Sequence, residues 1–264
     1  ELSILFADLR GFTTLSRDLP PRDLYLLLGE ILEALTDAVL DEDGVVLDYY
    51  GDGLSALWNA PLDCLNHADA ACRAALTMVG SLLGIDARWK DRLGGPLRIR
   101  VGVHTGQAHV GNAGTARRFK YGPRGLAVHL ASRVETAAKY LEVPVLITAA
   151  TRRRLGSDFF TLRVCRAKLP GFAEPNELFA VYRAAQADRL QEKLDRYADA
   201  LRLFEAGDLD ATEQLLEELQ LEPGIAPAEF LADHAASVRR GGRGRRATDV
   251  IGEGPGAVIE LLAK

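Results

Sequence analysis

Two aspartates in the first quarter of the chain stand where metal chemistry would need them. Asp8 follows an apolar run and precedes a Leu-Arg-Gly-Phe-Thr turn, and Asp52 lies inside a Tyr-Gly-Asp-Gly turn. Carboxylates are ligands that Mg²⁺ prefers, and this ion commonly uses one or two of them together with substrate phosphates. Two such ions about 3.5–4 Å apart could stabilise the attacking and leaving oxygens of a phosphoryl displacement. The pair predicts a divalent-metal site if the fold brings the two turns together.

The turn after Asp8 also predicts phosphate binding. Gly11, Phe12 and Thr13 precede the expected start of a short helix, where backbone amides point toward an anion. Metal ions and phosphate-directed amides together fit a nucleoside triphosphate. Each aspartate taken alone is also compatible with a simple helix cap or turn residue.

The elements around these residues predict a mixed α+β fold. Residues 2–7 read as a strand, residues 21–40 as an amphipathic helix, and 45–50 with 54–58 as a hairpin that carries Asp52 at its tip. Further helices are expected at about 64–89, 125–140 and 148–155, and further strands near 97–105, 107–110, 143–147, 159–164 and 177–182. A glycine-punctuated turn is expected after residue 110. The strands and helices do not alternate regularly along the chain, as they would in a parallel barrel, and their order favours helices packed on one sheet.

Composition limits the class of protein. The chain has 264 residues, 48% hydrophobic content and a net charge of −5, which suits a globular domain and argues against a surface built for nucleic acid or anionic lipid. Three cysteines without metal-ligand spacing predict neither a disulfide framework nor a zinc site and favour a reducing, cytoplasmic setting. No membrane segment is expected within the chain. The strand at its very start suggests a piece of a longer protein, and a membrane anchor upstream is compatible with this expectation.

The C-terminal third has a different character. Residues 185–238 are charged and helical in pattern and resemble a single tetratricopeptide-like repeat, which would have to pack on the main domain or on a partner. Residues 239–264 are expected to form an Arg/Gly-rich linker and tail. Nucleic-acid contact by the arginines is the alternative for that linker, although no nucleic-acid partner is expected.

Four sequence blocks, in order and spacing, resemble the catalytic domain of class III adenylate and guanylate cyclases. They are FADLRGFT at 6–13, GDGLSALW at 51–58, RVGVHTG at 100–106 and LASRVE at 130–135. The resemblance covers residues 1–184, which are expected to be the catalytic domain. It implies a ferredoxin-like core and a purine nucleotidyl cyclase that makes a 3′,5′-cyclic nucleotide and pyrophosphate from ATP or GTP.

The resemblance also implies a homodimer with active sites at the interface and two Mg²⁺ or Mn²⁺ ions. Asp8, Asp52 and the backbone carbonyl of Leu9 match the metal ligands of the family. Arg133 matches the arginine that stabilises charge on the transferring phosphoryl group, a role that suits its permanently charged fork of donors. An upstream sensor domain, absent from this chain, would supply the activating signal.

Two positions that read the purine in this family differ here. Asp48 stands where adenylate cyclases carry a lysine and guanylate cyclases a glutamate, and Gly122 occupies the second purine-reading position. A carboxylate accepts from the N1-H and N2-H groups of guanine, so Asp48 slightly favours guanine. A site of loose selectivity is the alternative, as is a solvated strand residue without a role in base reading.

Two further positions also depart from the family. His129 stands where an asparagine orients the ribose, and an imidazole can still form a hydrogen bond there. Lys168 lies near the position of a triphosphate-binding lysine and is expected to make at most a weak contact with the substrate.

These changes keep two other functions open. The first is a catalytically degenerate cyclase domain that binds nucleotide or dimerises to regulate another module. The second is a polymerase-like or diguanylate-forming palm domain, in which carboxylates also hold the catalytic metal ions. This alternative lacks support because no Gly-Gly-Asp/Glu-Glu-Phe signature is present.

Overall fold

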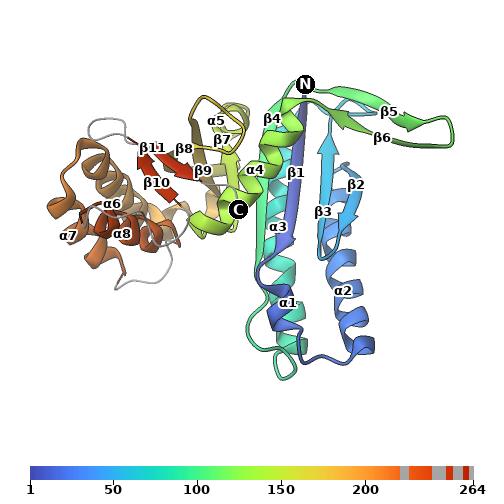
Figure 1. The fold of residues 1–264 in the computed structure, drawn as a ribbon, viewed down its shortest axis with the longest axis horizontal. Coiled ribbons are helices and arrows are strands. Elements are labelled where there is room, and N and C mark those ends of the chain that lie inside the picture. The colour runs from blue at the N-terminus through green and yellow to red at the C-terminus, as the bar shows by residue number, and fades with distance from the viewer. Residues whose placement is uncertain (221–225, 240–247, 252–257, 262–264) are drawn as a thin grey trace.

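The computed structural model describes residues 1–220, 226–239, 248–251 and 258–261. Figure 1 shows a long sheet with helices on both faces and a helical module at one end. The strands are β1 (Leu2–Leu9), β2 (Val45–Tyr50), β3 (Gly53–Trp58), β4 (Ile99–Gly106), β5 (His109–Thr115), β6 (Arg118–Arg124), β7 (Val145–Thr148), β8 (Phe159–Lys168), β9 (Asn176–Arg183), β10 (Thr248–Ile251) and β11 (Val258–Leu261). The helices are α1 (Phe12–Leu15), α2 (Pro21–Leu40), α3 (His67–Trp89), α4 (Leu126–Leu141), α5 (Ala149–Arg152), α6 (Ala187–Ala206), α7 (Leu209–Gln220) and α8 (Ala226–Arg239), with a short 3₁₀ turn at Ala184–Gln186.

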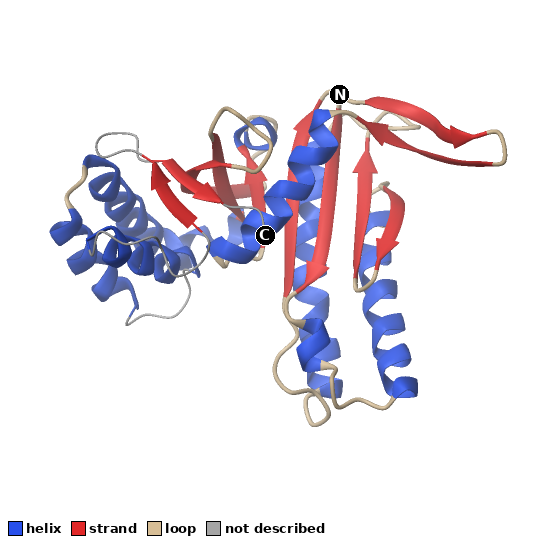
Figure 2. Ribbon diagram, in the orientation of Figure 1, coloured by secondary structure: helices blue, strands red, loops and turns tan. Residues whose placement is uncertain are grey.

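The main sheet has the strand order β10-β11-β8-β9-β7-β4-β1-β3-β2. Its pairs are antiparallel except for β4 with β7 and β11 with β8. This arrangement confirms the mixed α+β fold expected from the sequence (Figure 2).

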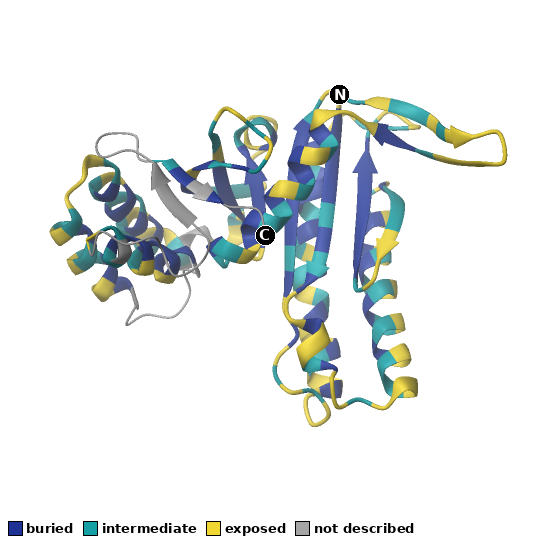
Figure 3. Cartoon of the chain, in the orientation of Figure 1, coloured by how far each residue is buried: buried dark blue, intermediate teal, exposed yellow. Residues whose placement is uncertain are grey.

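Alternation along β1 assigns each face of the sheet to different helices. Leu5 and Ala7 are buried in one cluster with residues of α2 and α3, whereas Leu2 and Ile4 are buried in another with Ala127 and Ala131 of α4. Figure 3 shows the central strands as the most buried part of the molecule. Asp8 has the parity of Leu2 and Ile4, so its side chain belongs to the face covered by α4.

Helix α3 is, among the described residues, the one helix long and apolar enough to cross a membrane by length and composition. The sequence did not predict such a segment. Half of the apolar window is buried, and α3 packs with α2 against the sheet. Its apolarity is therefore accounted for by the protein core.

Three segments differ from the sequence expectation. The glycine-punctuated turn after residue 110 is a β5–β6 hairpin, a separate two-stranded sheet that projects away from the main one (Figure 1). A third helix, α8, follows the expected helical hairpin, and strands β10 and β11 lie in the segment expected to be a tail. Most of the Arg/Gly linker, 240–247, lies outside the described residues.

Candidate functional site

The two predicted metal-binding aspartates lie side by side. β1 pairs with β3 so that Ala7 faces Leu54, which brings the turn carrying Asp52 to the end of β1. The approach is close because Gly53 has no side chain. A Cβ there would lie 2.3 Å from the carbonyl oxygen of Ala7 and 3.1 Å from Asp8 Oδ1. Glycine is therefore required at this position.

The electrostatics of the pair indicate a site that lacks positive charge. Burial, together with the negative charge of Asp52, raises the pKa of the Asp8 carboxyl to about 6, although Arg100 opposes the rise. Burial also raises the pKa of Asp52, although backbone amides, including that of Leu9, donate hydrogen bonds that oppose this. Two partly buried carboxylates that repel each other would be stabilised by a cation.

Arg100 supplies part of the positive charge beside the two aspartates, and the sequence analysis did not select it. Its guanidinium forms ion pairs with Asp8 on β1 and with Glu135 on α4. Helix α4 crosses β4 closely at Gly102, where an added Cβ would lie 2.1 Å from the amide nitrogen of Glu135. The β1–β4 register, in which Asp8 faces Arg100, is the signal that could have revealed the contact.

The donor set suits ions that share their coordination with a substrate. Within the described part of the chain, no group of three or more His, Cys, Asp or Glu side chains could hold a metal ion. Asp8 and Asp52 offer hard oxygen ligands, and the carbonyl of Leu9 lies at the end of the same strand. Two carboxylates completed by phosphate oxygens are typical of Mg²⁺ sites, so these residues fit the implied ions.

A cavity of about 340 Å³ opens beside the carboxylates. The residues lining it come from β1, β2, β3 and α4: Phe6, Ala7, Asp8, Tyr50, Gly53, Leu54, Ser132 and Glu135. The predicted phosphate turn follows β1 directly. Gly11 has φ 67° and opens the four-residue helix α1, Phe12 is buried and Thr13 is exposed. Burial of Phe12 anchors a turn whose other residues face solvent.

The two predicted residues of α4 point away from this cavity. His129 and Arg133 are one helical turn apart and both exposed, whereas their neighbour Ala131 is fully buried against the sheet. Neither side chain lines the cavity of its own chain. Arg133 therefore does not complete the Asp8 site within one described chain.

The predicted purine-reading positions lie together at the edge of the sheet. Asp48 on β2 forms an ion pair with Lys120 on β6, a residue that the sequence analysis did not select. Gly122, two residues along β6, approaches Leu47, since an added Cβ would lie 3.6 Å from Leu47 Cδ2. The base of the hairpin thus touches β2 at these two residues, and a basic residue accompanies Asp48.

Lys168 lies far from the carboxylates within the sheet. It ends β8, which is separated from β1 by β9, β7 and β4, and it faces β11 in the register. It does not line the cavity beside Asp8.

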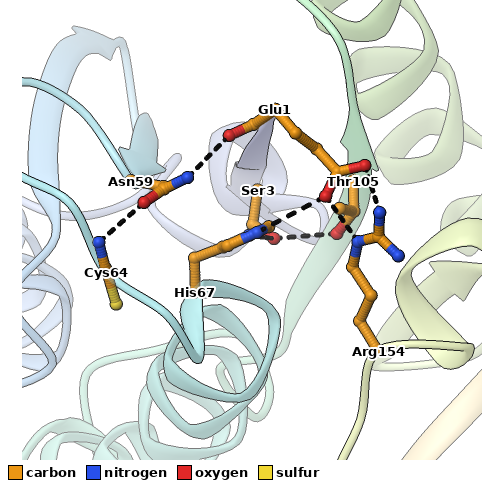
Figure 4. A network of polar contacts seen from close by, with 7 residues as sticks. All are labelled: Glu1, Ser3, Asn59, Cys64, His67, Thr105 and Arg154. Carbon is orange, nitrogen blue, oxygen red and sulfur yellow. Dashed lines mark hydrogen bonds and ion pairs between the residues drawn. The ribbon is translucent and has the colours of Figure 1, made fainter.

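A second polar cluster lies at the opposite end of β1 (Figure 4). Ser3 Oγ is 2.9 Å from His67 Nδ1 and 2.8 Å from Thr105 Oγ1, and Glu1 interacts with His67 and Arg154. The Ser-His-Glu arrangement resembles a nucleophile with its base, but Ser3 has no exposed surface. The cluster therefore ties β1 to α3 and β4 rather than serving a substrate.

Comparison with known proteins gives a consistent result. A family model described as the adenylate and guanylate cyclase catalytic domain matches residues 1–179. Adenylate cyclase 1 of Rhizobium meliloti is 33% identical over 150 residues, which are 57% of this chain and 23% of that protein. An adenylate cyclase of Mycobacterium bovis is 34% identical over 160 residues, 60% of this chain and 34% of that protein. The chain therefore spans about a quarter to a third of the length of these relatives.

Solved structures of the same kind share the fold. The adenylyl cyclase CyaB from P. aeruginosa superposes with a TM-score of 0.64 at 28% identity, covering 69% of this chain and 93% of that one. A solved guanylyl cyclase superposes with a TM-score of 0.59 at 26% identity, covering 68% and 90%. Similarity thus extends to cyclases of both purines.

Proposed function

The chain belongs to the adenylate and guanylate cyclase catalytic-domain family, and from this premise we propose that it converts ATP or GTP into a 3′,5′-cyclic monophosphate and pyrophosphate. The observation that carries the proposal is the juxtaposition of Asp8 and Asp52 beside an open cavity of about 340 Å³. Both carboxylates are partly buried and short of positive charge, as expected for groups that receive a metal-bound triphosphate.

Asp8, Asp52 and the carbonyl of Leu9 would hold two Mg²⁺ or Mn²⁺ ions. Ions bound there would lower the pKa of the ribose 3′-hydroxyl and neutralise the triphosphate. The substrate phosphates would lie against the backbone of Gly11, Phe12 and Thr13. The 3′-hydroxyl would then lose its proton to solvent and attack the α-phosphorus in line. The new bond joins O3′ to the α-phosphorus, the bond from the α-phosphorus to the oxygen bridging to the β-phosphate breaks, and pyrophosphate leaves.

Arg133 and His129 act in the site of a second copy of the chain. Both are exposed on α4 and absent from the cavity of their own chain, so a twofold dimer would supply what each cavity lacks. Arg133 would stabilise charge on the transferring phosphoryl group, and His129 would orient the ribose. Lys168 would make only a weak contact with the triphosphate, across the same interface.

We assign residues 1–184 to the catalytic domain, 185–238 to a helical module and 239–264 to a C-terminal segment whose strands β10 and β11 extend the main sheet beside β8. Strand β9 ends at Arg183, which supports the first boundary, and α8 ends at Arg239, which supports the second. The three cysteines are free, which suits a reducing, cytoplasmic setting. An upstream sensor in the full-length protein would supply regulation.

Product analysis tests the proposal. The purified chain is incubated with ATP or GTP and with Mg²⁺ or Mn²⁺, and products are identified by mass spectrometry beside an Asp8→Asn control. A cyclic nucleotide made only by the unsubstituted protein is expected. Failure of dimeric protein to form product with either nucleotide and either metal would favour a regulatory, nucleotide-binding role instead.

A further inference from the structure

The β5–β6 hairpin contacts β2 at the purine-reading positions. Lys120 and Gly122 alternate by two along β6 and so share one face of the strand. The first contacts Asp48 through an ion pair, and the second approaches Leu47. The same face of the hairpin therefore meets two consecutive residues of β2.

Lys120 supplies the side chain that Gly122 lacks. Gly122 presents no functional group above β2, whereas the ammonium of Lys120 reaches the carboxylate of Asp48. Arg124 also carries a positive charge on β6, but its guanidinium donates to the carbonyl of Pro123 at 2.9 Å. The side chains of Lys120 and Asp48 are 46% and 44% exposed, so a ligand can reach both.

We propose that Lys120 is a specificity-determining residue that reads the purine together with Asp48 and favours adenine. This inference rests on the proposed function, because it assigns the base-reading part of the same nucleotide site. It revises the slight guanine preference expected for Asp48 alone.

The hydrogen-bonding capacity of the pair explains the choice of base. Adenine presents an N6 amino donor beside the N1 acceptor, which matches one carboxylate oxygen beside one ammonium. Guanine can also meet the pair, with O6 against the ammonium and N1-H against one carboxylate oxygen, but its second donor, N2-H, would then need the other carboxylate oxygen. In Asp48, Oδ2 is engaged by Lys120 and Oδ1 accepts from the amide of Tyr49 at 3.1 Å. The pair therefore suits adenine better than guanine.

Binding of 3′-deoxy-ATP and 3′-deoxy-GTP, which cannot cyclise, separates base reading from turnover. Their dissociation constants are measured by calorimetry on the full chain with Mg²⁺. The unsubstituted protein is expected to prefer the adenine nucleotide. Lys120→Met keeps the apolar stem, removes the charge, and should lower the adenine-to-guanine affinity ratio about tenfold, as expected for loss of a charge-assisted hydrogen bond. Lys120→Gln should lower it in the same direction.

Lys90→Met is the matched control, because Lys90 is an exposed lysine at the end of α3. Its affinity ratio should equal that of the unsubstituted protein. Both substitutions of Lys120 should fold, because an exposed ion pair contributes little to stability. A ratio that stays at the unsubstituted value in Lys120→Met and Lys120→Gln overturns the inference.

Turnover of ATP and GTP by the same proteins distinguishes this inference from the proposed function. Cyclic product from the unsubstituted chain, with an affinity ratio unaffected at Lys120, would reject the base-reading role and leave the cyclase intact. A ratio that falls in Lys120→Met, in a chain that forms no cyclic product, would support the base-reading role and reject the cyclase.

Discussion

At the residue scale, Arg100 is the side chain on which the charge balance of the site depends. It lies between Asp8 and Glu135, and its own side chain is 17% exposed. With Asp52 nearby, one guanidinium faces three carboxylates. Removal of a partner from a partly buried ion pair leaves uncompensated charge, which costs more than the pair contributes.

Arg100→Gln should lower the free energy of unfolding by on the order of 2 kcal/mol at pH 7 without divalent ions, less than for a fully buried pair because the site is open. Mg²⁺ should restore more stability in this variant than in the unsubstituted protein, since the ion replaces the missing positive charge. Urea unfolding with and without Mg²⁺ measures both effects. Arg88→Gln, which breaks the more exposed pair with Glu30, should change stability by less than about 1 kcal/mol. Equal Mg²⁺ responses in all three proteins would contradict this account.

His104 gives a pH dependence of stability that is independent of catalysis. Burial lowers the pKa of His104 from 6.5 to about 4, and its Nδ1 lies 2.9 Å from Thr148 Oγ1. Below pH 6.5 the unfolded chain binds a proton that the folded chain does not, so the stability present above pH 6.5 is lost as the pH falls toward 4. The loss from this one group should approach about 3 kcal/mol at pH 4.

Unfolding free energies of the unsubstituted protein and His104→Gln, measured between pH 4 and 7, isolate this effect. The difference in unfolding free energy between the two proteins should become smaller as the pH falls, because glutamine does not titrate. The contributions of the other titrating groups are the same in both proteins and cancel in the difference. A difference that is constant over this range would show that His104 does not titrate on unfolding.

Sequence reasoning found those site residues that depend on local turns. Asp8 and Asp52 were predicted because each lies at a recognisable turn, and the pairing of β1 with β3 brings them together. Arg100 and Lys120 were missed because their contacts depend on register between β1 and β4 and on a hairpin crossing β2. Such contacts join residues far apart in sequence, and no single segment encodes them.

At the element scale, the packing of α4 on β4 positions the site. Gly102 lets the helix backbone approach the strand directly, which fixes Glu135 beside Arg100. The sequence predicted α4 closely but missed the β5–β6 hairpin. Many of its residues are exposed and it contains Gly111 and Gly114, so it shows neither the apolar alternation nor the β-branched run typical of strands.

Gly102→Ala should displace α4 and lower both cyclase activity and stability, because the added Cβ would lie 2.1 Å from the backbone nitrogen of Glu135. Gly80→Ala in α3 is the matched control, since nothing lies within 4 Å of its added Cβ. That control should gain about 0.5–1 kcal/mol of stability from the higher helix propensity of alanine. Thermal unfolding and cyclic nucleotide formation report the two effects. Equal stability of the two variants would show that α4 can move away without cost.

At the scale of the whole molecule, the C-terminal helices share a core with the catalytic domain. Tyr197, Leu201 and Phe204 of α6 are buried in one cluster with Val134 of α4 and Val164 of β8. The hydroxyl of Tyr197 donates to the Val164 carbonyl at 2.8 Å. The helical module therefore packs directly on β8 and on α4, the helix that carries Glu135, and stabilises both.

Leu201→Ala should cost about 2–4 kcal/mol of unfolding free energy, as large-to-small substitutions in a packed core do. Leu83→Ala in α3 removes the same atoms from a side chain that is 74% exposed and should change stability little. Chemical unfolding followed by circular dichroism compares the two. If Leu201→Ala proves as mild as Leu83→Ala, the module does not share the core.

Mixing two inactive variants tests most directly that this chain is a cyclase whose active site is shared between two copies. Asp8→Asn removes a carboxylate, and Arg133→Ala removes the arginine that we assign to the partner's site. The two variants are unfolded together and refolded as an equal mixture, so about half of the dimers are heterodimers, each with one intact site of two. Cyclic nucleotide formation should therefore recover to about a quarter of the unsubstituted rate. A mixture no more active than the two variants alone, beside an active unsubstituted protein, would contradict the shared site.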